Sequence, residues 1–535
     1  MKETQNQNKA SPIVDAVREA YRAGQEDEAL EPIIAVDRKD NPIGRIQDGD
    51  YVIFYDIRGE REVEITQSLI EEDFSHFHTK KGLHPHFVTM IEYSSQLNVK
   101  AAFPPEGSLS NTFAEVISRE GFRFVKIAES EKAVHIGYFM NGKREQPFPN
   151  EERMIVPSPE GIDSYALCPE MSVSKVSSEI IKKIEDPSYR VIIANFANVD
   201  VVGHIENEGA VKKAVQAVDK ELKNIVDTCI KEKMTLIVTA DHGTVEEWLY
   251  PDGTIDTGHT RNPVPFILID TPAEKPEKYK LRKEASLIDI APTMLELLNL
   301  TQPQEMTGKS LLETAPDEIE GERRILLLIL DGWGMRDQKK GNLIYAAQTP
   351  NFDMMWKKYP HTLLQASGDA VGMPKGTVGN SEAGHLHIGA GRRIYLDRVK
   401  IDRAIEDGSF YRNEAFTWAM EKAKEKNKAL HLLGIVSFYS SHGTIDHLFA
   451  LLRLAKKIGN KKVFVHALIG RRGEKPESGA IYVDKVVEMC EKLELGKVVT
   501  VIGRFWALDR EENWDRIEKT YSALVHGTGT HVVCC

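Results

Sequence analysis

The sequence is poor in cysteine, and its few cysteines form no recognisable pattern. Five are present among 535 residues, and no two of them form a CxxC pair. A disulfide framework normally shows an even number of cysteines at regular spacing. The composition therefore argues against a disulfide-stabilised fold and fits a reducing compartment, so we expect a cytoplasmic protein.

Three further features are missing. No stretch approaches the roughly 20 apolar residues that a membrane-spanning helix needs. Residues 1–11 lack the apolar run of a secretory signal, and their polar composition predicts a disordered, solvated tail. The formal net charge of -12 lacks the basic surplus typical of nucleic-acid-binding proteins. We therefore expect no membrane and no nucleic acid as partner, and a local cluster of residues must hold any anionic ligand.

The chain has enough apolar material for more than one core. Its 535 residues exceed what a single core normally supports, and 41% of them are hydrophobic. In the last third, the runs ALHLLGIVS, KVFVHALIG and KVVTVIGRF alternate with helical patterns and predict an α/β domain. Residues 313–324 are charged and poor in apolar residues, which is typical of a surface connector.

Three other apolar runs end in acidic residues or lead into them. These runs, VIIANF, TLIVTA and ILLLIL, are typical of buried parallel strands and predict a second α/β domain. Ligand chemistry in such folds lies beyond the carboxyl ends of the strands, where Asp200, Asp241 and Asp331 fall. The alternative for any one of them is a helix cap.

Histidines accompany these acids at spacings that suit metal binding. Asp200 and His204 are four positions apart, which places both side chains on one face of a helix, although a turn would serve equally. Asp241 and His242 are adjacent, so their side chains diverge and suit a site with two metal centres. His259 follows a turn-rich segment, and a solitary histidine of this kind is more often structural than a ligand.

A serine in a glycine-rich segment is the candidate nucleophile. Ser381 lies in GTVGNSEAGHLHIGAGR, where glycines permit the close approach of a phosphate. A serine hydroxyl is a poor nucleophile at neutral pH, but coordination to a metal activates it. Two metals then stabilise the attacking and leaving oxygens of an in-line displacement. Carboxylate and imidazole ligands without thiolates favour manganese or zinc over a magnesium-only site.

These motifs resemble those of the cofactor-independent (2,3-bisphosphoglycerate-independent) phosphoglycerate mutases, in the alkaline phosphatase superfamily. The resemblance covers nearly the whole chain in rotated order: residues 323–535 resemble the amino-terminal half of the family, and residues 11–312 resemble its carboxyl-terminal half. It therefore implies a circular permutant, which is tolerable where the original termini lie close together. It also implies an alkaline-phosphatase-like metal domain over 108–396 and a transferase domain built from 12–98 and 404–535.

The resemblance assigns roles residue by residue. It implies that one metal is bound by Asp200, His204 and His259, and the other by Asp241, His242, Asp331 and Ser381. It implies that substrate is bound by His442, Arg472, Arg504, Arg510, Arg58 and Arg61 in the transferase domain and by Lys132 in the phosphatase domain. The guanidinium group of arginine can form paired hydrogen bonds to the phosphate and to the carboxylate of a phosphoglycerate. The alternative for each arginine is a surface ion pair.

Two departures from the family pattern affect substrate handling. Phe438 and Tyr439 stand where the family has an Asp and a Gly, and Gly473 stands where an Asp normally contacts the glycerate. The metal and nucleophile positions are all intact. We therefore expect this chain to retain the chemistry of phosphoryl transfer. The two departures affect its specificity for the mutase substrate instead.

The sequence thus predicts an enzyme that interconverts 3-phosphoglycerate and 2-phosphoglycerate through a phosphoserine at Ser381. It is expected to use two divalent metal ions, manganese first and zinc or magnesium as alternatives, to need no 2,3-bisphosphoglycerate, and to be a monomer. One alternative is a metal-dependent phosphatase or phosphomutase that acts on another small phosphate ester. Another is a non-catalytic metal-binding homologue, which the retention of all seven metal-site residues disfavours.

Overall fold

The computed structural model describes residues 11–105, 107–159, 161–162, 164–273, 279–315, 322–438, 442–470 and 477–534. The chain divides into two units, which are described separately. Unit 1 comprises Met1–Pro105 and Asp397–Cys535, and unit 2 comprises Glu106–Leu396. Residues 1–10 of the predicted tail lie outside the described part of the chain.

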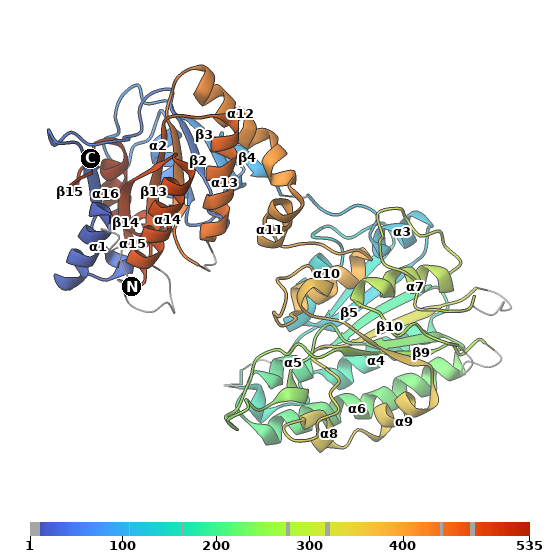
Figure 1. Cartoon of the computed structure of the whole chain (residues 1–535). Helices are drawn as coiled ribbons and strands as arrows, with labels where there is room; N and C mark the ends of the chain where they lie inside the picture. Colours follow the sequence, from blue (N-terminus) through green and yellow to red (C-terminus); the bar gives the residue numbers. More distant parts are fainter. Residues whose placement is uncertain are drawn as a thin grey trace, which may run out of the picture. The chain divides into compact units, whose positions relative to one another are not determined.

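Unit 2 is built on a seven-stranded sheet with the order β11-β9-β8-β10-β7-β5-β6 (Figure 1). Its strands are β5 (Phe124–Glu129), β6 (Glu151–Val156), β7 (Val191–Phe196), β8 (Thr235–Thr239), β9 (Val264–Ile269), β10 (Ile325–Leu330) and β11 (His361–Leu364). Strands β6, β5, β7, β10 and β8 are parallel neighbours, whereas β9 pairs antiparallel with both β8 and β11. The carboxyl ends of five adjacent strands therefore share one edge of the sheet.

Helices cover both faces of this sheet (Figure 1). They are α3 (Phe113–Arg119), α4 (Val173–Glu185), α5 (Asn198–Gly203), α6 (Glu208–Lys231), α7 (Ile290–Leu297), α8 (Leu343–Ala347), α9 (Pro350–Lys358) and α10 (Ser381–Ala390). Helix α6 contacts α4, α8 and α9, and α10 contacts α3 and α7. Because the strands are covered on both faces, they need continuous apolar runs rather than alternating ones.

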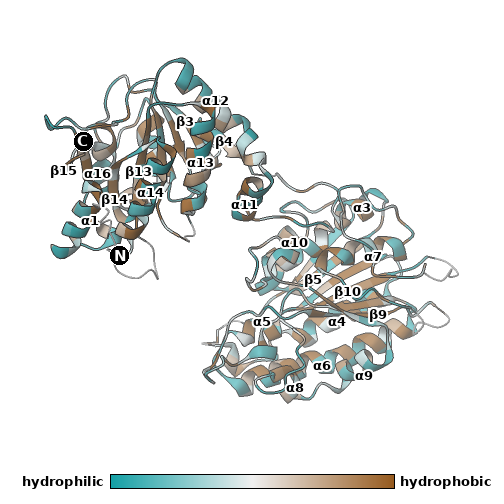
Figure 2. Cartoon of the chain, in the orientation of Figure 1, coloured by the Kyte–Doolittle hydropathy of each residue, from teal (hydrophilic) through white to brown (hydrophobic). Residues whose placement is uncertain are grey.

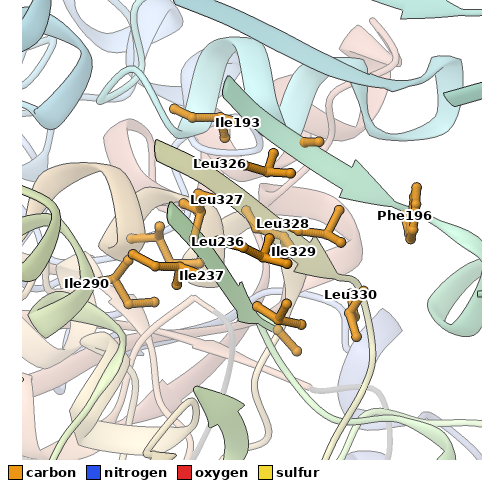
Figure 3. Close-up of a cluster of buried hydrophobic side chains, with 14 of the residues drawn as sticks. Ile193, Phe196, Leu236, Ile237, Ile290, Leu326, Leu327, Leu328, Ile329 and Leu330 are labelled. Atoms are coloured by element: carbon orange, nitrogen blue, oxygen red, sulfur yellow. The ribbon is translucent and has the colours of Figure 1, made fainter. Parts of the chain in front are cut away.

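The core of unit 2 is centred on β10. All six residues of this strand, ILLLIL, are buried, and they pack with Ile193 of β7, Leu236 of β8 and Ile290 of α7 (Figure 3). The strands are hydrophobic along their length, while the helices carry hydrophilic residues on their outer surfaces (Figure 2). The predicted α/β class is confirmed.

Unit 1 contains an eight-stranded sheet with the order β15-β1-β14-β13-β12-β2-β3-β4. Its strands are β1 (Ile33–Val36), β2 (Tyr51–Phe54), β3 (His86–Ile91), β4 (Lys100–Phe103), β12 (Leu430–Ile435), β13 (Val463–Ile469), β14 (Lys497–Gly503) and β15 (Thr530–Val533). Its helices are α1 (Pro12–Arg22), α2 (Val63–Ile70), α11 (Asp397–Asp407), α12 (Glu414–Glu425), α13 (Ile445–Ile458), α14 (Gly479–Leu493), α15 (Arg504–Ala507) and α16 (Trp514–Val525). The α/β domain predicted from the last third of the sequence is thus also present, and β2 from the start of the chain pairs in parallel with β12 from its last third.

The predicted connector 313–324 is described only at its ends, because residues 316–321 lie outside the described ranges. Arg323, near its end, is buried rather than on the surface. Its guanidinium group donates two hydrogen bonds to Asp270, with lengths of 3.0 and 2.9 Å. Among the described residues, no helix is both long and apolar enough to cross a membrane.

The central position of β10 predicts a large stability effect for Leu328→Ala. Leu328 is fully buried, so its truncation leaves a cavity that is expected to lower the free energy of unfolding by about 2–5 kcal/mol. Leu363→Ala on β11 is the matched control, because that side chain is 39% exposed and its loss is expected to cost about 0.5 kcal/mol or less. Urea denaturation monitored by circular dichroism measures both. Equal losses in the two variants would contradict this description of the core.

Candidate active site

Polar side chains that follow four neighbouring strands lie at one edge of the unit 2 sheet. Lys132 ends the short 3-10 helix that follows β5, and Asp200 lies in α5, which follows β7. Asp331 follows the last residue of β10 directly, and Asp241 and His242 follow β8. Because these strands are adjacent and parallel, residues separated by up to 199 positions are brought into contact.

Ser381 lies among these residues as the first residue of α10. The N-cap residue Asn380 fixes the start of this helix by accepting a hydrogen bond from the backbone N–H of Ala383. The Ser381 Oγ atom lies 2.7 Å from Lys132 Nζ, 3.0 Å from His242 Nε2 and 3.1 Å from Asp331 Oδ1. The predicted nucleophile is therefore held between a cation, an imidazole and a carboxylate at the N-terminus of a helix, where backbone N–H groups favour negative charge.

One group of potential metal ligands surrounds Asp200. The Asp200 Oδ1 atom lies 3.1 Å from His259 Nε2, 3.3 Å from His204 Nε2 and 3.5 Å from His242 Nε2. The opposite ring nitrogens of His259 and His204 donate to the carbonyl oxygens of Gly379 and Thr257, at 2.9 and 2.8 Å. Because a carbonyl can only accept, either ring in its neutral form carries the lone pair on Nε2, the atom that faces Asp200.

A second group contains Asp241, Asp331 and His385. The Asp241 Oδ1 atom accepts from the backbone N–H of His242 at 3.0 Å, and Asp241 Oδ2 has no hydrogen-bond partner among the described residues. His385 Nδ1 lies 3.2 Å from this Oδ2 atom, and Asp331 Oδ2 accepts from Asn195 Nδ2 at 2.8 Å. One ligand atom from each of Asp241, Asp331 and His385 lies within 4.8 Å of the other two.

Two members of this site, His385 and Asn195, were not predicted from the sequence. Asn195 also lies 3.0 Å from His385 Nε2, so the pair links Asp331 to Asp241 through side chains. His385 is one helical turn after Ser381 in α10, a spacing that places both side chains on one face of the helix. That spacing was the available signal for His385, whereas Asn195 lies inside an apolar strand and gives none.

The charges at this edge shift the pKa values of its members strongly. Burial alone would lower the pKa of His242, but Asp241, Asp331 and Asp200 outweigh burial and raise it to about 10. Burial likewise lowers the pKa of Lys132, and the same three carboxylates raise it by more. The pKa of Asp200 and that of Asp331 are held well below their usual range, because Lys132 and the neighbouring histidines outweigh burial.

The donor set at this edge fits divalent cations. Two groups of carboxylate oxygens and imidazole nitrogens are available, and the buried Asp241 Oδ2 atom has no hydrogen-bond donor among the described residues. Such mixed oxygen and nitrogen sets bind manganese or zinc well. Lys132, predicted to bind substrate, contacts Asp200 and Asp331 directly, at 2.6 and 2.8 Å.

Four of the predicted substrate-binding arginines lie close together in unit 1. Glu60 contacts both Arg58 and Arg510, at 3.1 and 2.6 Å. The pKa of Arg61 is lowered by burial and by the neighbouring charges of Arg510, Arg58 and Arg504. Four guanidinium groups this close to one another repel, so the cluster is suited to an anion with more than one negative charge.

A cavity of about 190 Å³ adjoins this arginine cluster. Its lining consists of Glu28, Arg61, Arg504, Phe505, Leu508, Asp509, Glu511 and Arg516. Arg504 is held by Glu28 at 2.8 Å, and Arg61 donates to the carbonyl oxygen of Leu508 at 3.0 Å. These contacts fix the guanidinium groups beside a space of the size of a small metabolite.

The remaining predicted substrate residues lie apart from this cavity or outside the described ranges. His442 is fully buried, and its Nδ1 atom lies 2.6 Å from Glu62 Oε1. Phe438 is 64% exposed. Arg472 lies outside the described residues, as do the two departures Tyr439 and Gly473.

Comparisons with known proteins identify two matching families. The Metalloenzyme superfamily matches residues 21–302, and the family described as the BPG-independent PGAM N-terminus matches residues 401–534. A solved structure, the Leishmania mexicana phosphoglycerate mutase at low cobalt concentration, is 26% identical with a TM-score of 0.36, covering 52% of this chain and 53% of that one.

The curated relatives carry one common description. A 2,3-bisphosphoglycerate-independent phosphoglycerate mutase 1 of Methanosarcina acetivorans is 40% identical over 308 residues, which is 57% of this chain. A 2,3-bisphosphoglycerate-independent phosphoglycerate mutase of Clostridium perfringens is 40% identical over 306 residues, also 57% of this chain. One of Thermosynechococcus vestitus is 39% identical over 315 residues, or 58% of this chain. Each match spans 58% of the relative's own length.

The raised pKa of His242 predicts that metal binding depends on pH. With a pKa of about 10, the ring is protonated at neutral pH in the metal-free chain, and it must lose this proton to act as a ligand. The apparent affinity for Mn²⁺ is therefore expected to rise steadily from about pH 6 to about pH 9. Isothermal titration calorimetry in buffers of different ionisation enthalpy measures the released proton. An affinity independent of pH, with no proton released, would exclude His242 as a ligand.

Proposed function

We propose that the chain, which belongs to the Metalloenzyme superfamily, is within it a 2,3-bisphosphoglycerate-independent phosphoglycerate mutase and interconverts 3-phosphoglycerate and 2-phosphoglycerate. The observation that carries the proposal is the position of Ser381. Its Oγ atom lies within 3.1 Å of Lys132, His242 and Asp331, between two groups of metal-ligand residues. A buried serine in such surroundings is suited to accept a phosphoryl group.

We assign the metal ligands as two sets. The first set is Asp200, His204 and His259, and the second is Asp241, His242, Asp331 and Ser381. Manganese is the proposed ion at both, because the donors are carboxylates, imidazoles and a hydroxyl without thiolates. When bound, the two ions lower the pKa of the serine hydroxyl and neutralise the charge that develops on the transferred phosphoryl group.

The proposed reaction has two halves. In the first, a bond forms between Ser381 Oγ and the phosphorus of 3-phosphoglycerate as the bond from phosphorus to the glycerate oxygen breaks. Ser381 Oγ loses its proton and the departing glycerate oxygen gains one, so the glycerate leaves as an alcohol. In the second half, the other hydroxyl of the retained glycerate takes the phosphoryl group, and Ser381 regains a proton.

The chain's own residues stabilise the phosphorylated state. The Lys132 ammonium group, 2.7 Å from Ser381 Oγ, is placed to donate hydrogen bonds to phosphoryl oxygens. The N-terminus of α10 supplies backbone N–H groups and the positive end of the helix dipole at the same atom. Each contact is stronger for a phosphoserine than for a neutral hydroxyl.

We assign unit 2 as the phosphatase domain and unit 1 as the transferase domain. The support for unit 1 is the group of Arg58, Arg61, Arg504 and Arg510 beside the 190 Å³ cavity, which suits the phosphate and carboxylate of a phosphoglycerate. The proposed circular permutation is supported by the order of the matches, because a family described as an N-terminus matches residues 401–534. We further propose that the protein acts as a monomer in the cytoplasm.

Phosphorus NMR tests the proposal directly. The full-length protein with Mn²⁺ is incubated with 3-phosphoglycerate, and the signals of 2-phosphoglycerate and free phosphate are followed with time. The proposal predicts 2-phosphoglycerate without added 2,3-bisphosphoglycerate. Release of free phosphate as the main product would instead identify a phosphatase, and no turnover of any phosphate ester would favour a non-catalytic metal-binding protein.

Ser381→Ala is expected to abolish phosphoryl transfer while preserving the fold, because the substitution removes one oxygen from the proposed acceptor. The rate of 2-phosphoglycerate formation should fall by at least about 1,000-fold, comparable to the loss of a nucleophile in other covalent mechanisms. Circular dichroism and the melting temperature control for folding. Ser367→Ala, in an exposed contact with the carbonyl oxygen of Arg261, is the matched control and should retain activity. Turnover of Ser381→Ala near the wild-type rate would eliminate the covalent mechanism.

Arg61→Met is expected to weaken substrate binding. It removes a charge from the cavity wall while keeping a long side chain, so the KM for 3-phosphoglycerate should rise roughly ten- to hundredfold, the value of one hydrogen bond to a charged group. Arg18→Met, whose side chain pairs with Asp15 on α1, controls for loss of a surface charge. Steady-state kinetics compares the two, and an unchanged KM in Arg61→Met would remove this cavity from the substrate site.

A further inference from the structure

Unit 1 contains a second, separate group of buried ionisable residues. Asp56 follows β2, Glu62 precedes α2 directly, and His442 precedes α13. All three side chains are fully buried, and one ligand atom from each lies within 4.8 Å of the other two. Parallel pairing of β2 with β12 brings these residues together from opposite ends of the chain.

The existing contacts leave one oxygen of each carboxylate without a hydrogen-bond partner among the described residues. Glu62 Oε1 pairs with His442 Nδ1 at 2.6 Å, and Asp56 Oδ1 accepts from the backbone N–H of Ile435 at 2.7 Å. No lysine or arginine in the described part of the chain forms an ion pair with either carboxylate. Two ionised carboxylates beside one imidazole would leave an unbalanced negative charge in this buried site, which is costly.

A proton on Asp56 would relieve this charge but would not supply the missing contacts. Asp56 Oδ2 and Glu62 Oε2 are both buried without a hydrogen-bond partner among the described residues. Burial and the charge of Glu62 raise the pKa of Asp56 well above its usual range, which shows how unfavourable the pair of charges is.

We propose that Asp56, Glu62 and His442 bind a third divalent cation, of the manganese or zinc class. Two carboxylates balance the charge of one such ion when the imidazole is neutral. The oxygens that lack a hydrogen-bond partner would then coordinate the ion. One nitrogen and two carboxylate donors form a set that both metals accept. The inference concerns unit 1 alone and does not rest on the proposed reaction, and it gives His442 a metal-binding role where the family resemblance implies contact with substrate.

The backbone around this group is arranged to hold its geometry. Ile57 N donates to the carbonyl oxygen of His442 at 2.7 Å, and Tyr93 Oη donates to the carbonyl oxygen of Asp56 at 2.8 Å. A Cβ atom at Gly434 would lie 2.7 Å from Asp56 Oδ1, so glycine leaves room for this carboxylate. A cation here would connect the two ends of segment 56–62, which carries Arg58 and Arg61, and so hold these arginines in place.

Anomalous diffraction from crystals of the full-length wild-type protein soaked in Mn²⁺ alone tests this inference. The expected result is a peak among Asp56, Glu62 and His442, in addition to the peaks in unit 2. Crystals with loaded unit 2 sites and no peak at Asp56 would overturn it. Empty unit 2 sites would instead count against the proposed function, so the two failures are distinguishable.

Metal content in solution gives an independent readout. Wild-type protein is expected to retain three manganese ions per chain after gel filtration, and Glu62→Gln and Asp56→Asn are expected to retain two. Glu64→Gln is the matched control, a buried glutamate two positions away whose Oε1 atom accepts from the backbone N–H of Glu512, and it should retain three. An unchanged metal content in both Glu62→Gln and Asp56→Asn, relative to wild type, would overturn the inference.

Discussion

Parallel pairing of β5, β7, β10 and β8 is the constraint on which the chemistry of unit 2 depends. It aligns four carboxyl ends at one edge and so brings Lys132, Asp200, Asp331 and Asp241 into one site. This pairing is stabilised by burial of the strands on both faces, with β10 at the centre. The core and the site are therefore not separable, because a change in the register of β10 would displace Asp331 as well as the apolar side chains.

Charge compensation is the second organising principle, and it differs between the two units. In unit 2, Lys132 and His242 face Asp200, Asp241 and Asp331, which explains the raised pKa values of both basic groups. In unit 1, Asp56 and Glu62 are fully buried, and among the described residues the pair of Glu62 with His442 is the only ion pair that either carboxylate forms. Clusters of like charge are costly to bury, so they indicate positions where a ligand of opposite charge stabilises the folded chain.

The sequence predicted the fold class and the arrangement of the central acids because both follow from local patterns. A strand buried on both faces must be apolar along its whole length, as in Ile325–Leu330, and the residue after it must lie at the sheet edge. Asn195 was not predicted, because its position inside β7 carries no periodic or motif signal. Residues 56 and 442 are brought together only by the pairing of β2 with β12, which a single sequence does not specify. The roles of Arg472 and Gly473 stay predictions, because both lie outside the described residues.

The central claim is that the convergence of strand ends makes Ser381 a phosphoryl acceptor. The most direct measurement is acid quenching of the manganese-loaded protein within milliseconds of mixing with 3-phosphoglycerate, followed by mass spectrometric mapping of the phosphorylated peptide. The account predicts phosphate on Ser381, in the peptide that contains GNSEAGHLHIGAGR. Phosphate on another residue, or turnover of substrate with no phosphorylated peptide at any quench time, would contradict it.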